Sequence, residues 1–149
     1  MNIISEQVEV LKEALKGKRK HNVIYGKLED KVIIGNDTRL YVIPKKECGV
    51  DLTNIDSNNV NIIQESTLKN FMNDDLCENV TLTDDKKVVD KKTLRVFSNG
   101  DENIYVDESL IKHFDLENST FKGKGARSIV YIYEDEVMVG LVLPILVKN

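Results

Sequence analysis

The chain contains 149 residues, of which 41% are hydrophobic and 31% charged, and it carries a formal net charge of −4. This length and composition are typical of one soluble globular domain and exclude a disordered or membrane-spanning chain. The negative charge argues against nucleic-acid binding over the whole surface but leaves room for a local basic face. The length predicts a single domain over residues 1–149. The first residues lack the cationic and apolar regions of a secretion signal, so we expect the protein in the cytoplasm.

A helix is expected near the start of the chain. Ser5 can cap it, and Val8, Leu11 and Leu15 recur at the helical period, which predicts that they form its buried face. Gly17 supplies a stop signal. We therefore place the first helix between Ser5 and about Leu15.

A three-stranded meander is expected next, because the apolar period changes to two after residue 22. Its strands cover residues 23–28, 31–34 and 39–43, and turn-forming residues separate them. Pro44 ends the meander, since a proline cannot donate a hydrogen bond to a strand ladder.

The middle of the chain is expected to hold a polar loop and one short helix. Residues 45–61 are rich in Asn and Asp, which predicts a loop with at most one short strand. Leu68, Phe71 and Met72 share one face of a short helix that begins at Glu65. The helix is followed by a strand near residues 80–83 and an exposed charged stretch over residues 86–92.

The last third begins with short strands over residues 93–97 and 104–106. Asp107 can cap a helix that runs through Phe114, and residues 121–124 then lead into the final hairpin.

The hairpin covers residues 128–147 and is the most apolar part of the sequence. Two β-branched and aromatic runs are separated by Glu-Asp-Glu, which predicts two strands and a tight connection. The second run is apolar throughout, so we expect both of its faces to be buried at the centre of the core.

These elements predict an α+β fold, with helices packed on one side of largely antiparallel sheets. A helix and a β-meander occur in the first half, and the same kind of unit follows in the second half. This order predicts an internal duplication of elements, although no sequence repeat of fixed period accompanies it.

No catalytic or cofactor site is predicted. Cys48 and Cys77 have no metal-binding spacing and suit reduced packing residues. His21 and His113 belong to no recognisable set with a nucleophile and an acid. We therefore expect a protein that is not an enzyme and that needs no cofactor.

One stretch has the spacing of a calcium loop. Asn54, Asp56, Asn58 and Glu65 match its first, third, fifth and twelfth positions, but Asn59 stands where the loop needs glycine. An asparagine-rich turn explains the pattern better than calcium, so no metal site is expected.

The densest basic cluster lies near the start of the chain and consists of Lys12, Lys16, Lys18, Arg19 and Lys20. Such a cluster can neutralise the phosphates of duplex DNA without reading its sequence. The alternative is solvated surface, in which the lysines complement the carboxyl end of the first helix. Residues 122–127 are a second basic stretch, but they lack the Gly-Lys-Ser/Thr ending of a phosphate-binding loop and suit a mobile loop before the hairpin.

Four stretches of the sequence resemble the bacterial sliding DNA clamp family. Residues 139–147 are similar to the last clamp strand, which ends in an apolar run and Met-Pro-Met, and residues 106–114 resemble the final clamp helix. Residues 128–132 resemble the strand after that helix, and residues 32–40 resemble a strand-turn-strand of the first half. Together they comprise 32 of the 149 residues.

The resemblance implies a non-catalytic clamp-like domain in DNA replication or repair. Clamps encircle duplex DNA without base readout and bind partner peptides in an apolar groove near the C-terminus, where Leu143, Pro144 and Ile145 are the candidates by position. A clamp subunit has three such domains, so a ring built from this chain would be a homo-oligomer. Leu146 replaces a basic residue of the family. The alternative is a protein-interaction module of clamp-like fold, from a phage or mobile element, that does not bind DNA.

Overall fold

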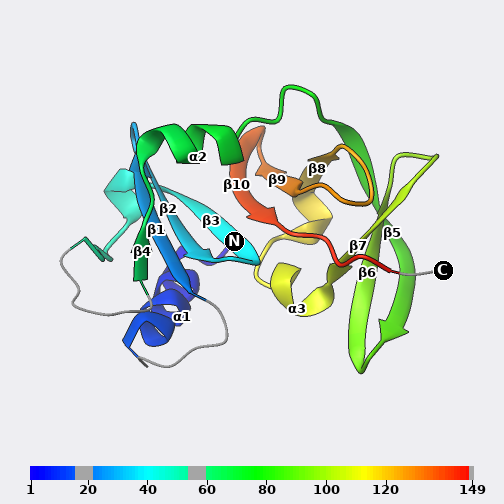
Figure 1. Ribbon diagram of the computed structural model, residues 1–149, viewed down its shortest axis with the longest axis horizontal. Helices are drawn as coiled ribbons and strands as arrows, with labels where there is room; N and C mark the ends of the chain where they lie inside the picture. Colours follow the sequence, from blue (N-terminus) through cyan, green and yellow to red (C-terminus); the bar gives the residue numbers. More distant parts are fainter. Residues whose placement is uncertain (16–21, 54–59, 148–149) are drawn as a thin grey trace. The chain divides into compact units, whose positions relative to one another are not determined.

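The computed structural model describes residues 1–15, 22–53 and 60–147 (Figure 1). They form two compact units, Met1–Asn73 and Asp74–Asn149. Three α-helices and ten strands lie within the described residues, so the predicted α+β class is confirmed. None of the described helices is long and apolar enough to cross a membrane. Whether the two units make one domain stays a prediction.

The first unit is a four-stranded sheet with two helices. Its elements are α1 (Ile3–Leu15), β1 (Val23–Leu28), β2 (Lys31–Asn36), β3 (Arg39–Pro44), η1 (Lys45–Glu47), β4 (Val60–Ile62) and α2 (Glu65–Phe71). The strand order is β4-β1-β2-β3, with β4 parallel to β1 and the other pairs antiparallel. The predicted meander is therefore confirmed, with Pro44 as its last residue.

The turn between β2 and β3 is set by one side chain. Asn36 Oδ1 accepts hydrogen bonds from the Thr38 backbone N–H at 2.9 Å, from Thr38 Oγ1 at 2.7 Å and from the Arg39 backbone N–H at 3.0 Å. An asparagine that bonds the backbone two and three residues ahead imitates a backbone turn. The strands on either side are thereby held in register.

Helix α1 begins earlier than expected. Asn2, not Ser5, caps it, because the Ser5 backbone N–H donates to Asn2 Oδ1 at 3.1 Å. The predicted buried face is also wrong, since Val8 is 45% exposed whereas Val10 and Ala14 are buried.

Polar contacts explain the orientation of α1. Gln7 donates from Nε2 to the Glu47 carbonyl at 2.9 Å and accepts from the Gly49 N–H at 2.6 Å. Glu9 Oε1 lies 2.6 Å from Nη2 of Arg39, which is buried on β3. These bonds orient the helix by its polar residues, which hydrophobic periodicity does not count.

The second unit is a six-stranded sheet with one short α-helix. Its elements are β5 (Glu78–Val89), β6 (Lys92–Ser98), β7 (Asn103–Asp107), α3 (Glu108–Ile111), η2 (Leu116–Asn118), β8 (Ser119–Gly123), β9 (Val130–Glu134) and β10 (Val137–Val142). The strand order is β10-β9-β8-β5-β6-β7, and neighbours are antiparallel. Asp107 caps α3 as predicted, since its side chain accepts from the Ser109 N–H.

Strand β5 is much longer than the strand expected near residues 80–83. It pairs with β8 over residues 78–80 and with β6 from Thr81 onward, with a register shift between Leu82 and Lys86. The charged stretch over residues 86–92 is therefore the end of a two-stranded ribbon with β6, and most of it is exposed as expected. Its lysines give no apolar alternation, which is why the sequence did not predict a strand.

The terminal hairpin is confirmed as β9 and β10, but its second strand is not wholly buried. Val137 is 51% exposed, and only residues 140–142 of β10 are buried. The chain leaves the strand after Val142 and crosses to β7, where the Ile145 N–H donates to the Tyr105 carbonyl at 2.7 Å. The apolar run is thus divided between β10 and an extended segment.

Candidate functional site

The structure describes one member of the predicted basic cluster. Lys12 is exposed on α1 and forms no ion pair with any described residue. Lys16, Lys18, Arg19 and Lys20 lie outside the described residues. The calcium-like spacing over residues 54–59 also lies outside them. A DNA-binding face near α1 therefore stays a prediction.

One of the three predicted groove residues, Ile145, lines a cavity in the structure. A cavity of about 610 Å³ lies beside the C-terminal segment, which is defined here as residues 143–147. Its lining consists of Asn103, Tyr105, Ala126, Arg127, Ile145, Leu146 and Val147. Of the three predicted groove residues, Ile145 lines this C-terminal pocket, whereas Leu143 and Pro144 do not.

Hydrogen bonds from backbone N–H groups build this pocket from three parts of the chain. The bridge between Ile145 and Tyr105 fixes the C-terminal segment against β7. Ser128 Oγ accepts from the N–H groups of Lys124 and Gly125 at 3.0 and 2.9 Å, which closes the loop before β9 into a turn. The Ala126 N–H donates to Glu102 Oε2 at 3.1 Å, so the same loop is joined to the start of β7.

The chemistry of the C-terminal pocket is apolar with one cation. Leu146 is 59% exposed and stands beside half-buried Ile145 and Tyr105. Arg127 is exposed and forms no ion pair with a described residue. Sequence reasoning missed Tyr105 because only the bridge brings it to Ile145, 40 residues away in the chain. It missed Arg127 because the folded loop before β9 brings that residue to the pocket.

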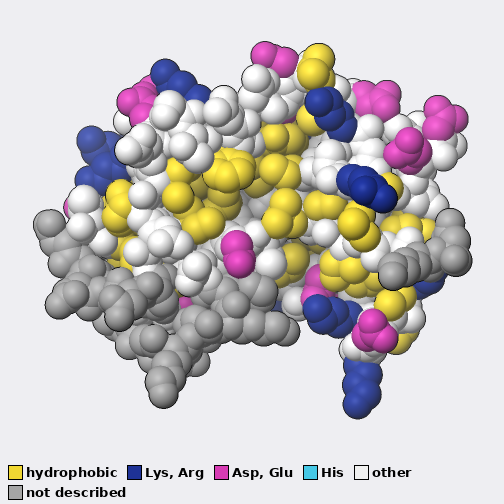
Figure 2. All heavy atoms as spheres, viewed as in Figure 1, with side chains coloured by type: hydrophobic (Ala, Val, Ile, Leu, Met, Phe, Trp, Pro, Cys, Tyr) yellow, Lys and Arg dark blue, Asp and Glu magenta, His cyan; other side chains and the backbone are white. Residues whose placement is uncertain are grey.

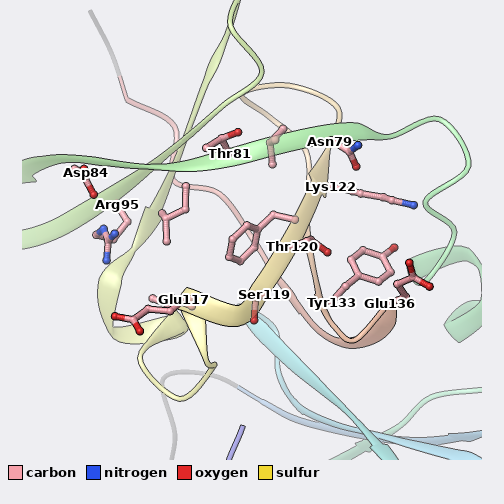
Figure 3. A pocket seen from close by; sticks show the side chains of 14 residues that line it. Asn79, Thr81, Asp84, Arg95, Glu117, Ser119, Thr120, Lys122, Tyr133 and Glu136 are labelled. Atoms are coloured by element: carbon pink, nitrogen blue, oxygen red, sulfur yellow. The ribbon is translucent and has the colours of Figure 1, made fainter.

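A larger cavity of about 1090 Å³ opens between β5 and β8. The two strands pair where Val80 faces Phe121, and then diverge because β5 turns toward β6. Figure 3 shows Thr81 and Asp84 on one side of the opening and Ser119 and Thr120 on the other. We call this cavity the β5–β8 fork.

Charged groups around the fork fall into two classes. Lys122 Nζ lies 3.6 Å from Asp74 Oδ2 and 5.1 Å from the centre of the Tyr133 ring, and the Tyr133 hydroxyl also donates to Asp74. Arg95 Nη1 lies 3.9 Å from Glu108 Oε1. Both cations of the lining are thus compensated within the second unit.

The carboxylates of the fork are different. Asp84, Glu117 and Glu136 are exposed and line the cavity, and none forms an ion pair or hydrogen bond with another described side chain. Figure 3 shows them around the rim of the opening. The uncompensated charge of the fork is therefore negative.

The free end of the β5–β6 ribbon carries lysines and an exposed apolar residue. Figure 2 shows dark blue side chains at this end, and Val88 is among the exposed large hydrophobic residues. Lys86 is paired with Glu108 at 2.9 Å, and Lys87 lies over the Tyr105 ring at 5.6 Å from its centre. Aspartates are interleaved with the lysines, so the ribbon has little net charge.

Two features of the described residues bear on metal binding and on thiol chemistry. They contain no group of three or more His, Cys, Asp or Glu side chains that could hold a metal ion. Burial raises the pKa of the Cys77 thiol, with the Asp74 carboxylate acting in the same direction. A raised pKa lowers the thiolate fraction and hence the nucleophilicity of that sulfur.

A scan against protein-family models, a search of curated proteins and a search of solved structures found no match. The resemblance to sliding clamps therefore stands on the sequence motifs alone, and function must be argued from the sites themselves.

Proposed function

We propose that this chain is a non-catalytic binding protein whose second unit receives an apolar peptide segment of a partner protein in the C-terminal pocket. The observation that carries the proposal is the bridge between Ile145 and Tyr105. It fixes the C-terminal segment at one residue, while Leu143 and Leu146 on either side are 42% and 59% exposed. Exposed apolar side chains on a fixed backbone are suited to recognition, because little conformational entropy is lost on binding.

The chemistry of the lining indicates the kind of peptide. A cavity of about 610 Å³ lies within the usual range for ligand pockets and has room for apolar side chains beside Ile145 and Tyr105. Arg127 can pair with a carboxylate of the same peptide. We therefore expect a short segment that combines an apolar anchor with an acidic residue.

The proposal includes a clamp-like fold, with helices on one side of the sheets and a duplicated helix-and-meander unit. The α+β class and the largely antiparallel pairing support it, as does the position of Ile145 in the run that resembles the last clamp strand. A one-domain clamp would form a homo-oligomer and act as a replication or repair accessory factor in the cytoplasm. A phage or mobile-element interaction module would use the same pocket without DNA.

Leu146→Ser tests the peptide site. Eight-residue peptides are selected from a random phage-displayed library on the full chain. Those that bind the C-terminal pocket should bind Leu146→Ser about tenfold more weakly than the native chain, since an interface anchor contributes about 1 to 2 kcal/mol. Leu76→Ser is the matched control, because Leu76 is also an exposed leucine, at 78%, and lies outside the pocket. Both variants should keep the melting temperature. A selection in which no peptide binds Leu146→Ser more weakly than the native chain would contradict the proposal.

Duplex DNA is the second candidate, and the exposure of Lys12 without an ion pair on α1 favours it. Binding should be independent of DNA sequence and fall steeply with salt, because it would rest on phosphate neutralisation. Replacing Lys12, Lys16, Arg19 and Lys20 by glutamate should abolish binding without lowering the melting temperature. Titration of labelled duplex at low salt measures this, and no binding by the native chain would leave the peptide site alone.

A further inference from the structure

The residues that line the β5–β8 fork show that it opens between strand edges. Successive side chains of a strand point to opposite faces, so a pocket on a sheet face is lined by alternate residues. The fork is instead lined by consecutive residues, 79–82 of β5 and 119–122 of β8. The backbone of both strands therefore borders the cavity.

The edge of β8 that faces the fork is unpaired at its start. Ser119 and Thr120 pair with Glu134 and Tyr133 of β9, but β5 pairs only with residues 121–123 of β8. Alternate residues of an antiparallel strand direct their N–H and C=O groups to opposite neighbours. One of Ser119 and Thr120 thus directs both groups into the fork, where no described strand receives them.

The side chains of the fork define a partner. Val80 and Phe121 are buried at its base, and Leu82 and Leu116 are half-buried beside them, so the interior can accept an apolar side chain. The rim carries the uncompensated carboxylates of Asp84, Glu117 and Glu136. A complementary segment has an apolar residue flanked by lysine or arginine.

We propose that the β5–β8 fork binds an extended segment of a partner protein, which adds a strand to the free edge of β8. Backbone hydrogen bonds to the Ser119–Thr120 edge supply affinity, as in other cases of strand addition. An apolar side chain of the segment enters between Leu82 and Leu116, and its flanking cations pair with the rim carboxylates. This site is separate from the C-terminal pocket and does not rest on its function.

The experiment uses the same peptide selection on the full chain, with binding measured by fluorescence polarisation. The peptides that bind the fork should be enriched in an apolar residue flanked by Lys or Arg. They should lose about tenfold in affinity for the triple variant Asp84→Asn, Glu117→Gln, Glu136→Gln, because three exposed ion pairs are lost together and each contributes modestly. Glu65→Gln with Asp101→Asn and Asp115→Asn is the control variant, since all three carboxylates are exposed and lie outside the fork.

Backbone methylation of the peptide separates strand addition from side-chain docking. A selected peptide is made in two forms, N-methylated at odd or at even positions. Only alternate N–H groups of an added strand face β8, so one form should lose binding at least tenfold while the other retains it. Neither form changes the protein, so its folding cannot confuse the result.

Three results would overturn the proposal. The selection could yield no peptide that depends on the rim carboxylates, or both methylated forms could bind equally. Alternatively, the chain could self-associate in light scattering, with dissociation caused by the triple variant, in which case a second copy occupies the fork. Leu146→Ser should leave fork peptides bound, which distinguishes failure here from failure of the C-terminal pocket.

Discussion

Strand pairing runs the full length of the meander in the first unit, whereas in the second unit it changes partner within β5. Each of the six residues of β1 has a partner in β2, while β5 pairs with β8 over three residues before it turns to β6. Strands that pair along their whole length leave no free backbone group between them, whereas interrupted pairing exposes N–H and C=O groups at an edge. The unpaired strand edge on which the proposed peptide binding depends therefore lies where the sheet of the second unit divides.

Turn chemistry differs in the same way. The β2–β3 turn is held by the Asn36 side chain. The β5–β6 turn instead places Asp90 and Lys91 at φ values of 51° and 68°, a region that favours Gly and Asn. The β2–β3 turn thus has a residue that suits its conformation, whereas Lys91 in the ribbon turn does not suit a positive φ.

The largest expected effect concerns the buried end of β10, where Val142 pairs with Val130 of β9. Val142 on β10 is 1% exposed, so Val142→Asp buries an unpaired charge and should cost about 4 kcal/mol or more, enough to unfold the chain. Circular dichroism melting measures this. Val137→Asp is the control, because Val137 lies on the same strand but is half-exposed and should leave the melting temperature almost unchanged. A cooperatively melting Val142→Asp chain would contradict the burial of β10.

The next effect tests the close packing of the meander. A Cβ added at Gly35 would lie 2.1 Å from the Arg39 carbonyl oxygen and 2.9 Å from the Leu40 Cα, both of them backbone atoms. Gly35→Ala should therefore cost about 3 kcal/mol, since strands must separate to admit the methyl group. Urea unfolding measures the free energy. Gly49→Ala, whose nearest atom would be 3.6 Å away, should cost far less.

Unfolding at alkaline pH tests whether buried tyrosine hydroxyls contribute to the stability of both units. Burial raises the pKa of Tyr25 in the first unit and of Tyr131 in the second to about 12, from 10.0 in the unfolded chain. The folded state therefore keeps protons that the unfolded state loses, and stability should be fully present below pH 10 and decline as pH rises to 12. Each tyrosine adds a slope of about 1.4 kcal/mol per pH unit in that window.

Substitution isolates the contribution of each unit. Tyr25→Phe and Tyr131→Phe should each reduce the slope between pH 10 and 12, and urea unfolding across this range measures it. Equal slopes in the native chain and both variants would show that these phenols titrate normally in the folded state.

The smallest effect concerns the ribbon turn. Asp90→Asn with Lys91→Gly supplies the residues that a two-residue hairpin with positive φ prefers, and it should raise stability by about 1 kcal/mol. The melting temperature reports the gain. A decrease would mean that the lysine side chain contributes more than the turn conformation costs.

Local patterns in the sequence predicted the meander, helix α2, the Asp107 cap of α3 and the terminal hairpin, because each depends on residues near one another in the chain. The cap is the Asp107 side chain, which accepts a hydrogen bond from the backbone N–H of Ser109, two residues ahead. Helix α2 is one short helix that buries Leu68. Such features need no distant partner.

Only the tertiary structure decided which face of α1 is buried, how β5 divides between two neighbours and where the apolar C-terminal run leaves its strand. The α1 face follows from Gln7 and Glu9, whose partners lie 30 to 42 residues away. The path of the C-terminal segment follows from its bridge to Tyr105. The fork exists because β5 pairs with β8 over its first residues and with β6 over the rest. Contacts between distant segments carry no periodic signal in the sequence, so both candidate pockets became visible only when the strands were paired.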